Sequence, residues 1–523
     1  MKRKIFYGVP IYTMDPDRSI QQAVVVMNGE IEYVSANPNE AHTLYPDADL
    51  VELSGGCLIP GFVDAHLHLR EYSILFKDFD LTSAVHGEEL LSGVQSALSE
   101  KKKEEWFWAA GVAKHLLFSL RKEDIDTISP NNPVVLFASD ISMAAANSIA
   151  LAKAGIDQSR SDPLGGRIGR DSSGDPNGLL YDRAVELLRK ALPEEKTKVV
   201  DSSIEKGLSK MLTYGLTTIC DCSTQLGSES VRTLMKLLWK NRLKTRVVIM
   251  FGERDALRLG EIGFISHFGN DRLRMGGFFV SIDGSFSTLT AYMRSGYRGG
   301  SSNGLLLMDE EELSTVMRNQ FSHYFWGAVQ CVGDGANEIA MKVFNRIGSE
   351  VGVPRLLKRI DMACALNDGD IEAMSRNEVI PVMVPGHITT DRERAIRTLG
   401  ADARLLYRFR SVLDSGAHLA FASDSPYASV NPLDGIYSAV ERRGWGDGPE
   451  LRFYPKESVS IAEAVYAYTM GSARACGMDT EVGSIELGKH ADLVHLSHDI
   501  FSDDATSLKD ARVLGVFVGG EPV

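Results

Sequence analysis

The sequence has few cysteines and no long apolar run. Its 523 residues include six cysteines, too few for a disulfide-stabilised scaffold, so we expect free thiols and a reducing, cytoplasmic environment. No stretch approaches the roughly 18 consecutive apolar residues of a membrane-spanning helix. The opening residues, MKRKIFYGVPIYTMD, also lack the apolar core of a signal peptide. Secretion and membrane insertion are therefore not expected.

Positive charge is scarce as well. Lysine and arginine number 56 against 70 aspartates and glutamates, which gives a formal net charge of -14. This is the wrong sign for a protein that binds by neutralising phosphates. We therefore expect no nucleic acid and no membrane as partner. With 44% hydrophobic and 24% charged residues, the chain is typical of globular proteins, and its length allows about two to four domains.

Both ends of the chain are rich in short β-like runs. Residues 1–58 contain extended segments separated by Asp-Pro, Asn-Gly and Asn-Pro turn signals, and residues 482–523 have the same character. We expect these two segments to form one small composite β-sandwich domain.

The middle of the chain, residues 59–481, alternates apolar strand-like runs with amphipathic helical stretches. Such alternation predicts an α/β fold with a parallel sheet and crossover helices. The span exceeds the roughly 250 residues of a (β/α)8 barrel. We therefore expect a loop-rich insertion near 80–180, including the glycine-rich stretch 159–180.

A strand-like run near residue 60 ends in two histidines. Strand side chains alternate, so His66 and His68 share one face while Leu67 points the other way. Two imidazoles in this arrangement can chelate one metal ion. The pair alone is a weak signal, and its position at the end of a strand led by Pro60 and Gly61 strengthens it.

A second candidate lies in the run HLAFASDSP. Ala420, Ala422 and Asp424 share one strand face, which places the carboxylate at the carboxyl end of that strand. In barrels this end carries the active site. The alternative is that Asp424 caps the turn made by Ser425 and Pro426.

Several motifs together resemble the amidohydrolase superfamily, most closely the amidohydrolase-3 group that includes N-substituted formamide deformylases. They are GFVDAHLHL, the Asp283-Gly284-Ser285 run, the Gly333-Asp334 pair, FASDSP and the tail GSIELGKHADLVHL. The resemblance implies a distorted (β/α)8 TIM-like barrel, a β-sandwich built from both termini, and metal-dependent hydrolysis of a carbon–nitrogen bond.

Three positions depart from the family pattern. Phe279 stands where the resemblance implies a lysine that bridges two metals, and Gln330 and Met362 stand where it implies histidines. A binuclear centre is therefore not expected. The remaining ligand set, His66, His68 and Asp424, is sufficient for one divalent ion, with zinc favoured and iron or manganese as alternatives.

The resemblance also implies roles beyond metal binding. Asp424 would act as the catalytic acid–base that moves a proton from water to the leaving amine. The expected substrate-binding residues are His387, Gln330, Asp283, Phe279 and Met362. His418 and Cys364 are further candidates as base or ligand, for which simple packing is the alternative.

We therefore predict a hydrolase that acts on an amide or cyclic amide carbon–nitrogen bond of a small molecule. Its site would be mononuclear, with fewer metal ligands than the family pattern. The alternative is a barrel that has lost metal hydrolysis and serves as a small-molecule-binding protein, a lyase or an isomerase, because fold does not fix function. A structural protein has no sequence feature in its favour. The expected partner is a small-molecule substrate, and a homodimer is the oligomer we allow for.

Overall fold

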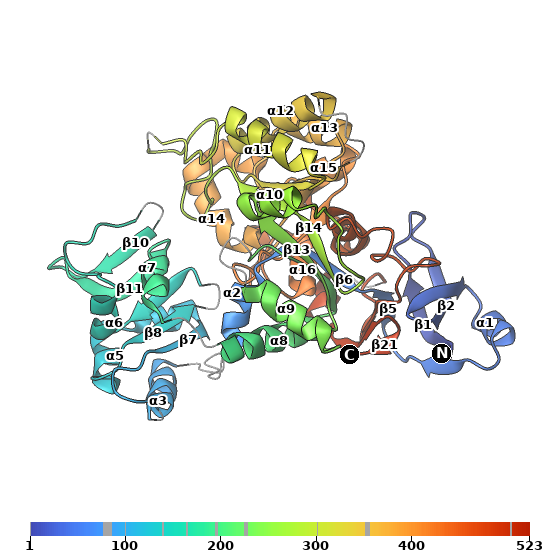
Figure 1. Ribbon diagram of the computed structural model, residues 1–523, viewed down its shortest axis with the longest axis horizontal. Coiled ribbons are helices and arrows are strands. Elements are labelled where there is room, and N and C mark those ends of the chain that lie inside the picture. Colours follow the sequence, from blue (N-terminus) through green and yellow to red (C-terminus); the bar gives the residue numbers. More distant parts are fainter. Residues whose placement is uncertain are drawn as a thin grey trace. The chain divides into compact units, whose positions relative to one another are not determined.

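The computed structural model describes residues 2–76, 86–99, 101–138, 141–163, 166–193, 197–223, 229–300, 302–350, 356–502 and 505–523. The chain divides into two compact units (Figure 1). The larger comprises Met1–Leu67, Ser209–Asp424 and Ser429–Val523, and the smaller comprises His68–Leu208 and Ser425–Ala428. Residues 77–85, partly within the expected insertion near 80–180, lie outside the described residues.

The larger unit contains a parallel sheet that closes into a barrel. Within the described residues its eight strands follow the order β18-β17-β16-β15-β14-β13-β12-β6. The edge strands meet where the N–H of Asp424 donates to the carbonyl oxygen of His66 at 2.9 Å. The expected distorted (β/α)8 barrel is thereby confirmed. The strands are β6 (Phe62–Leu67), β12 (Leu216–Asp221), β13 (Arg246–Gly252), β14 (Leu273–Ser281), β15 (Gly327–Gln330), β16 (Lys358–Asp361), β17 (Val379–Met383) and β18 (Ala420–Phe421).

Helices follow the barrel strands along the chain, as crossover connections require. Typical start signals fix several of them: Asp309 and Asn367 form capping boxes at the starts of α11 and α13. The helices are α9 (Glu229–Trp239), α10 (Glu253–Glu261), α11 (Glu310–Ser322), α12 (Asp334–Glu350), α13 (Asp368–Arg376), α14 (His387–Leu399), α15 (Phe409–Asp414), α16 (Pro432–Glu441), α17 (Ile461–Tyr466) and α18 (Ser472–Ala475), with α8 (Thr197–Thr213) leading into β12.

The two termini share one β-sheet in the larger unit, where Figure 1 shows blue and red strands side by side. β5 pairs with β1 from the N-terminal segment and with β19 from the tail. A sheet domain built from both termini is therefore present, as expected. Its strands are β1 (Lys4–Tyr12), β2 (Ile20–Met27), β3 (Glu30–Ser35), β4 (Asp49–Glu52), β5 (Cys57–Pro60), β19 (Leu493–Leu496), β20 (Val513–Val518) and β21 (Glu521–Pro522), and α1 (Pro38–Leu44) follows β3.

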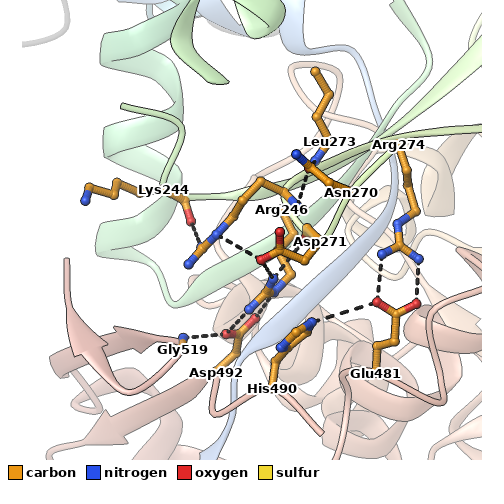
Figure 2. Close-up of polar contacts among 11 residues, drawn as sticks. Lys244, Arg246, Asn270, Asp271, Leu273, Arg274, Glu481, His490, Asp492 and Gly519 are labelled. Atoms are coloured by element: carbon orange, nitrogen blue, oxygen red, sulfur yellow. Dashed lines mark hydrogen bonds and ion pairs between the residues drawn. The ribbon is translucent and has the colours of Figure 1, made fainter. Parts of the chain in front are cut away.

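Ion pairs connect this terminal sheet to the amino ends of barrel strands. Figure 2 shows Arg246, at the start of β13, facing Asp492 and Asp271. Its Nε and Nη2 donate to the two carboxylate oxygens of Asp492 at 2.7 and 3.0 Å. Arg274 of β14 donates in the same bidentate way to Glu481 at 2.6 and 2.7 Å. Asp492, directly before β19, thus connects the terminal sheet to the barrel, and Glu481 holds the segment that leads into the tail.

The smaller unit has a sheet of its own. Over the residues described there, its strands follow the order β10-β11-β9-β8-β7. Alternate residues of β8 enter two different cores: Leu136 packs in one cluster and Phe137 in the other. The elements are β7 (Phe107–Val112), β8 (Val134–Ala138), β9 (Met143–Ala146), β10 (Gly166–Arg170), β11 (Pro176–Asp182), α2 (Leu69–Ser73), α3 (Gly87–Leu98), α4 (Lys114–Ser119), α5 (Lys122–Ile128), α6 (Ser148–Lys153) and α7 (Val185–Ala191).

The expectation that residues 159–180 form an inserted loop was wrong. β10 and β11 pair as an antiparallel hairpin, with Ile168 opposite Leu180. Both side chains are buried, and a turn at Asp171–Asp175 joins the strands. The glycine content favoured a loop, whereas burial of the few apolar residues on one face determined the structure.

The described residues contain no helix that is long and apolar enough to cross a membrane. All six cysteines belong to the described part of the chain, where each is buried and none forms a disulfide.

Candidate active site

His66 lies in the barrel interior near the carboxyl end of β6. Its side chain is fully buried, and its Nδ1 lies 2.6 Å from Oδ2 of Asp361, the last residue of β16. The same carboxylate oxygen accepts a hydrogen bond from Nη2 of Arg359 at 2.7 Å. Burial opposes the charged form of Arg359, but the Asp361 carboxylate and the neighbouring thiols of Cys220, Cys222 and Cys476 together raise the pKa of the guanidinium well above its usual value. His66 is therefore held by a carboxylate that is itself held by an arginine.

The other side of the His66 ring faces Asp424. Nε2 of His66 lies 3.8 Å from Oδ1 of Asp424, and Nε2 of His387 lies 2.9 Å from Oδ2 of the same carboxylate. His387 is the first residue of α14, and the Asp424 side chain is only 10% exposed. One carboxylate thus joins two imidazoles, with a wider gap on the His66 side.

The two contacts of His66 differ in whether a metal ion fits between the two atoms. Zinc ligands lie about 2.0–2.2 Å from the ion, so two tetrahedral ligand atoms are about 3.4 Å apart. The 3.8 Å between His66 Nε2 and Asp424 Oδ1 is close to that separation. The 2.6 Å between His66 Nδ1 and Asp361 Oδ2 is far shorter and has the length of a charge-assisted hydrogen bond. A divalent ion therefore fits on the Nε2 side of the ring.

The remaining expected ligand, His68, follows His66 by two residues and is the first residue of the smaller unit. There, its ring packs edge-on against Tyr427, with 5.5 Å between the ring centroids.

The carboxylate of Asp64 connects the first strand of the barrel to the segment that follows the last one. Oδ1 of Asp64 accepts the N–H of His66 at 3.2 Å and the N–H of Ser423 at 3.0 Å. Burial raises the pKa of Asp64 to about 6. Asp64 therefore links β6 to the segment that carries Asp424.

Buried thiols surround the Nδ1 side of His66. Sγ of Cys222, just after β12, lies 3.5 Å from His66 Nδ1. Burial and the neighbouring Cys220 raise the pKa of the Cys222 thiol well above its usual value. Cys222 therefore contacts the same nitrogen of His66 that faces Asp361.

Three expected substrate-binding residues lie on the interior side of neighbouring strands or just beyond them. The ring of Phe279 lies 5.3 Å from that of His66, between centroids. Gln330 is opposite Asp361 in the sheet register and half-buried. Met362 follows Asp361, is half-buried and has a φ of 55°. Phe279 contributes an apolar wall beside His66 where the family pattern has a lysine.

Asp283 is engaged by the main chain. Its carboxylate accepts hydrogen bonds from the N–H groups of Tyr292, Val332 and Gly333 at 2.8 to 2.9 Å. Burial raises its pKa to about 7, although the three donors favour the ionised form. The contacts join the loop after β14 to the end of β15, so the described geometry assigns Asp283 to loop positioning.

The structure separates two further candidates from the site. His418, a candidate base or ligand because it shares the strand parity of Asp424, is exposed and bonded to Arg474, because it precedes β18 and lies at the amino end of that strand. Cys364 is fully buried beside Tyr407 and Asp391. Neither contacts His66 or Asp424 in the described geometry.

Sequence reasoning missed Asp361, Arg359 and Cys222. The Arg359-Ile360-Asp361 run drew attention only to the following position, where a histidine was sought. Strand parity could have indicated that Arg359 and Asp361 share the interior face. Which strand ends would meet across the barrel was not available from the sequence.

The histidine and the aspartate lie at the carboxyl ends of parallel barrel strands, which is where TIM-barrel enzymes carry their active sites. A family model described as the amidohydrolase family matches residues 49–523, and the chain belongs to this family. This confirms the expectation of a hydrolase that acts on carbon–nitrogen bonds.

Relatives match along almost the whole chain. Protein LONG AFTER FAR-RED 3 of Arabidopsis thaliana is 29% identical over 98% of this chain and 90% of its own. N-substituted formamide deformylase of Arthrobacter pascens is 26% identical over 99% and 98%. The crystal structure of a metal-dependent hydrolase from Pyrococcus furiosus has a TM-score of 0.76 at 24% identity and covers 95% of this chain and 99% of its own. At that identity the structural likeness shows the fold.

Proposed function

We propose that this protein hydrolyses an amide or cyclic amide bond of a small molecule with one divalent metal ion, zinc in the first instance. The ligands would be Nε2 of His66, a carboxylate oxygen of Asp424, and His68. The observation that carries the proposal is the 3.8 Å gap between His66 and Asp424, inside a barrel of the amidohydrolase family. The named activity of the deformylase relative points to the same bond type.

Two imidazoles and one carboxylate leave room for water in a zinc coordination sphere. When bound, the ion would supply Lewis-acid polarisation and a more acidic water. The ion has a single proposed position because Phe279, Gln330 and Met362 offer no strong hard-metal ligand.

The proton is handled by Asp424 and His387. Their 2.9 Å contact allows a proton to be shared between carboxylate and imidazole. With one Asp424 oxygen directed to the ion, His387 is placed to hold the proton that the departing nitrogen must receive. Water adds to the carbonyl carbon, the carbon–nitrogen bond breaks, and the amine leaves protonated.

The surrounding side chains suggest the character of the substrate. Phe279 makes the wall beside His66 apolar, and Gln330 offers an amide at the same level of the barrel. We propose an uncharged, partly hydrophobic amide bound against these residues. The net charge of -14 is consistent with a small-molecule ligand and not with a nucleic acid or membrane partner. A homodimer stays a prediction.

The test combines metal analysis with an amide panel. Purified protein would be stripped with chelator, reloaded with zinc, manganese or iron, and assayed for amine release from N-substituted formamides, linear amides and cyclic amides. Activity should disappear on stripping, return on reloading, and be lost in His66→Asn and Asp424→Asn. His418→Asn is the matched control, because His418 is exposed and remote, and it should retain activity.

The alternative function gives a different result. If the protein binds amides from the panel without releasing amine, and chelation changes neither binding nor stability, it is a small-molecule-binding barrel. That outcome would overturn the hydrolase proposal.

A further inference from the structure

We propose that Asp361 is a positioning residue that fixes the tautomer and orientation of His66, so that the ring presents Nε2 to the metal ion. The inference deepens the proposed function, on which it rests for the identity of the ion.

The first observation is the direction of the hydrogen bond. A carboxylate only accepts, so the 2.6 Å contact between Asp361 Oδ2 and His66 Nδ1 requires the proton to be on Nδ1. A neutral imidazole with Nδ1–H has its lone pair on Nε2, which is the nitrogen 3.8 Å from Asp424. The acceptor on one side of the ring therefore determines which nitrogen can bind metal.

The second observation is that Asp361 is itself immobilised. Arg359 lies two residues earlier on the same strand face, and its Nη2 donates to the Oδ2 that meets His66. Its Nη1 donates to the carbonyl oxygen of Ala475 at 2.9 Å, and its guanidinium lies 5.6 Å from the ring centroid of Trp326. Arg359 and Asp361 are both fully buried. Ala475 and Trp326 thus hold Arg359 in place, and Arg359 holds the carboxylate of Asp361.

A metal ion on the other side of the ring is the competing arrangement. His66, Cys222 and Asp361 offer atoms within 4.8 Å of one another. The site already contains the Arg359 guanidinium, and the His66–Asp361 separation is too short for two ligands of one ion. We therefore assign this group to hydrogen bonding.

The tautomer can be measured without metal or mutation. In ¹⁵N-histidine-labelled, metal-free protein, the ring signals of His66, assigned by their loss in His66→Gln, should show a protonated Nδ1 and an unprotonated Nε2. The opposite pattern would overturn the inference. This readout also separates the two proposals: if the wild type binds no metal, the proposed function fails, while the ring signals still decide the role of Asp361.

Metal affinity supplies the second readout, by zinc competition against a chromophoric chelator. Asp361→Asn should weaken binding about 10-fold to 100-fold, the usual effect of losing such a partner, and Asp361→Glu should restore most of the loss. Asp370→Asn, which removes another buried carboxylate on the helix α13 that follows β16, should leave affinity unchanged. Equal affinities of wild type and a folded Asp361→Asn would contradict the inference.

Cobalt substitution shows on which side of the His66 ring the metal ion binds. Co²⁺-loaded protein should lack the near-ultraviolet band of a thiolate ligand. A band that disappears in Cys222→Ser would place the ion beside Nδ1 and overturn the assignment.

Discussion

His387 Nε2 lies 2.9 Å from Asp424 Oδ2, so the carboxylate that faces His66 also contacts a second imidazole. This contact gives Asp424 a partner for proton transfer that does not compete for the same oxygen. The contact also gives a structural meaning to the Pro385-Gly386-His387 run, since α14 begins at the histidine.

The role of His387 can be tested by His387→Gln. Because the variant keeps an amide near Asp424 but cannot carry a proton, we expect kcat to fall about 100-fold to 10,000-fold. Bound metal should stay at the wild-type level, since His387 is not a proposed ligand. The measurement is steady-state kinetics on the best amide of the panel, paired with metal analysis of the same samples. Loss of metal together with activity would contradict a proton-transfer role.

The number of metal ions per chain tests whether the site is mononuclear. Phe279 stands in the interior beside His66, where a bridging ligand would be required for a second ion. We expect close to one ion per chain by elemental analysis, and near none in His66→Asn. Two ions per chain would show that other side chains complete a binuclear centre.

The ion pairs of Figure 2 predict that the two aspartates that contact Arg246 contribute very differently to the free energy of unfolding. The Asp492 side chain is 3% exposed and the Asp271 side chain 48%. Asp492→Asn leaves the buried Arg246 without its bidentate partner and should cost about 3–5 kcal/mol. Asp271→Asn removes a half-exposed pair and should cost less than about 1 kcal/mol. Urea unfolding of both variants gives the comparison, and equal losses would refute it.

A pH dependence follows from Asp370. Burial, with smaller contributions from Glu338 and Asp334, raises the pKa of Asp370 from 3.8 to about 7 in the folded chain. The folded state therefore holds an extra proton between about pH 4 and 7, and the stability from this group is lost as pH rises through 7. Relative to Asp370→Asn, wild type should lose a few kcal/mol between pH 5 and pH 8, at about 1.4 kcal/mol per pKa unit.

The control for this prediction is the neighbouring Asp368, whose side chain is 78% exposed. Asp368→Asn should show a nearly constant difference from wild type over the same pH range. If urea unfolding gives the same constant difference for Asp370→Asn, the raised pKa is refuted.

Local sequence predicted the parts of the site that lie on one strand. Alternation placed His66 on the interior face of β6, and the small residues before Asp424 indicated a crowded strand end. The same alternation failed for His418, because β18 begins only at Ala420 and the histidine lies before it. Parity therefore predicts a face reliably only where the residue belongs to the strand.

The Asp361 contact could not be predicted in this way. His66 and Asp361 are 295 positions apart and lie on β6 and β16, which are not neighbours in the sheet order. Their meeting depends on barrel closure, which is a property of the whole fold. The hairpin at Ile168 and Leu180 likewise depends on burial within a unit whose sheet was not expected from the glycine-rich sequence.

The most direct test of the central claim is an anomalous diffraction map of zinc-loaded crystals, recorded on both sides of the zinc absorption edge. The account predicts one peak within bonding distance of His66 Nε2 and an Asp424 oxygen, with Asp361 still bonded to Nδ1. No peak at this position, or a peak on the Nδ1 side beside Cys222, would contradict it.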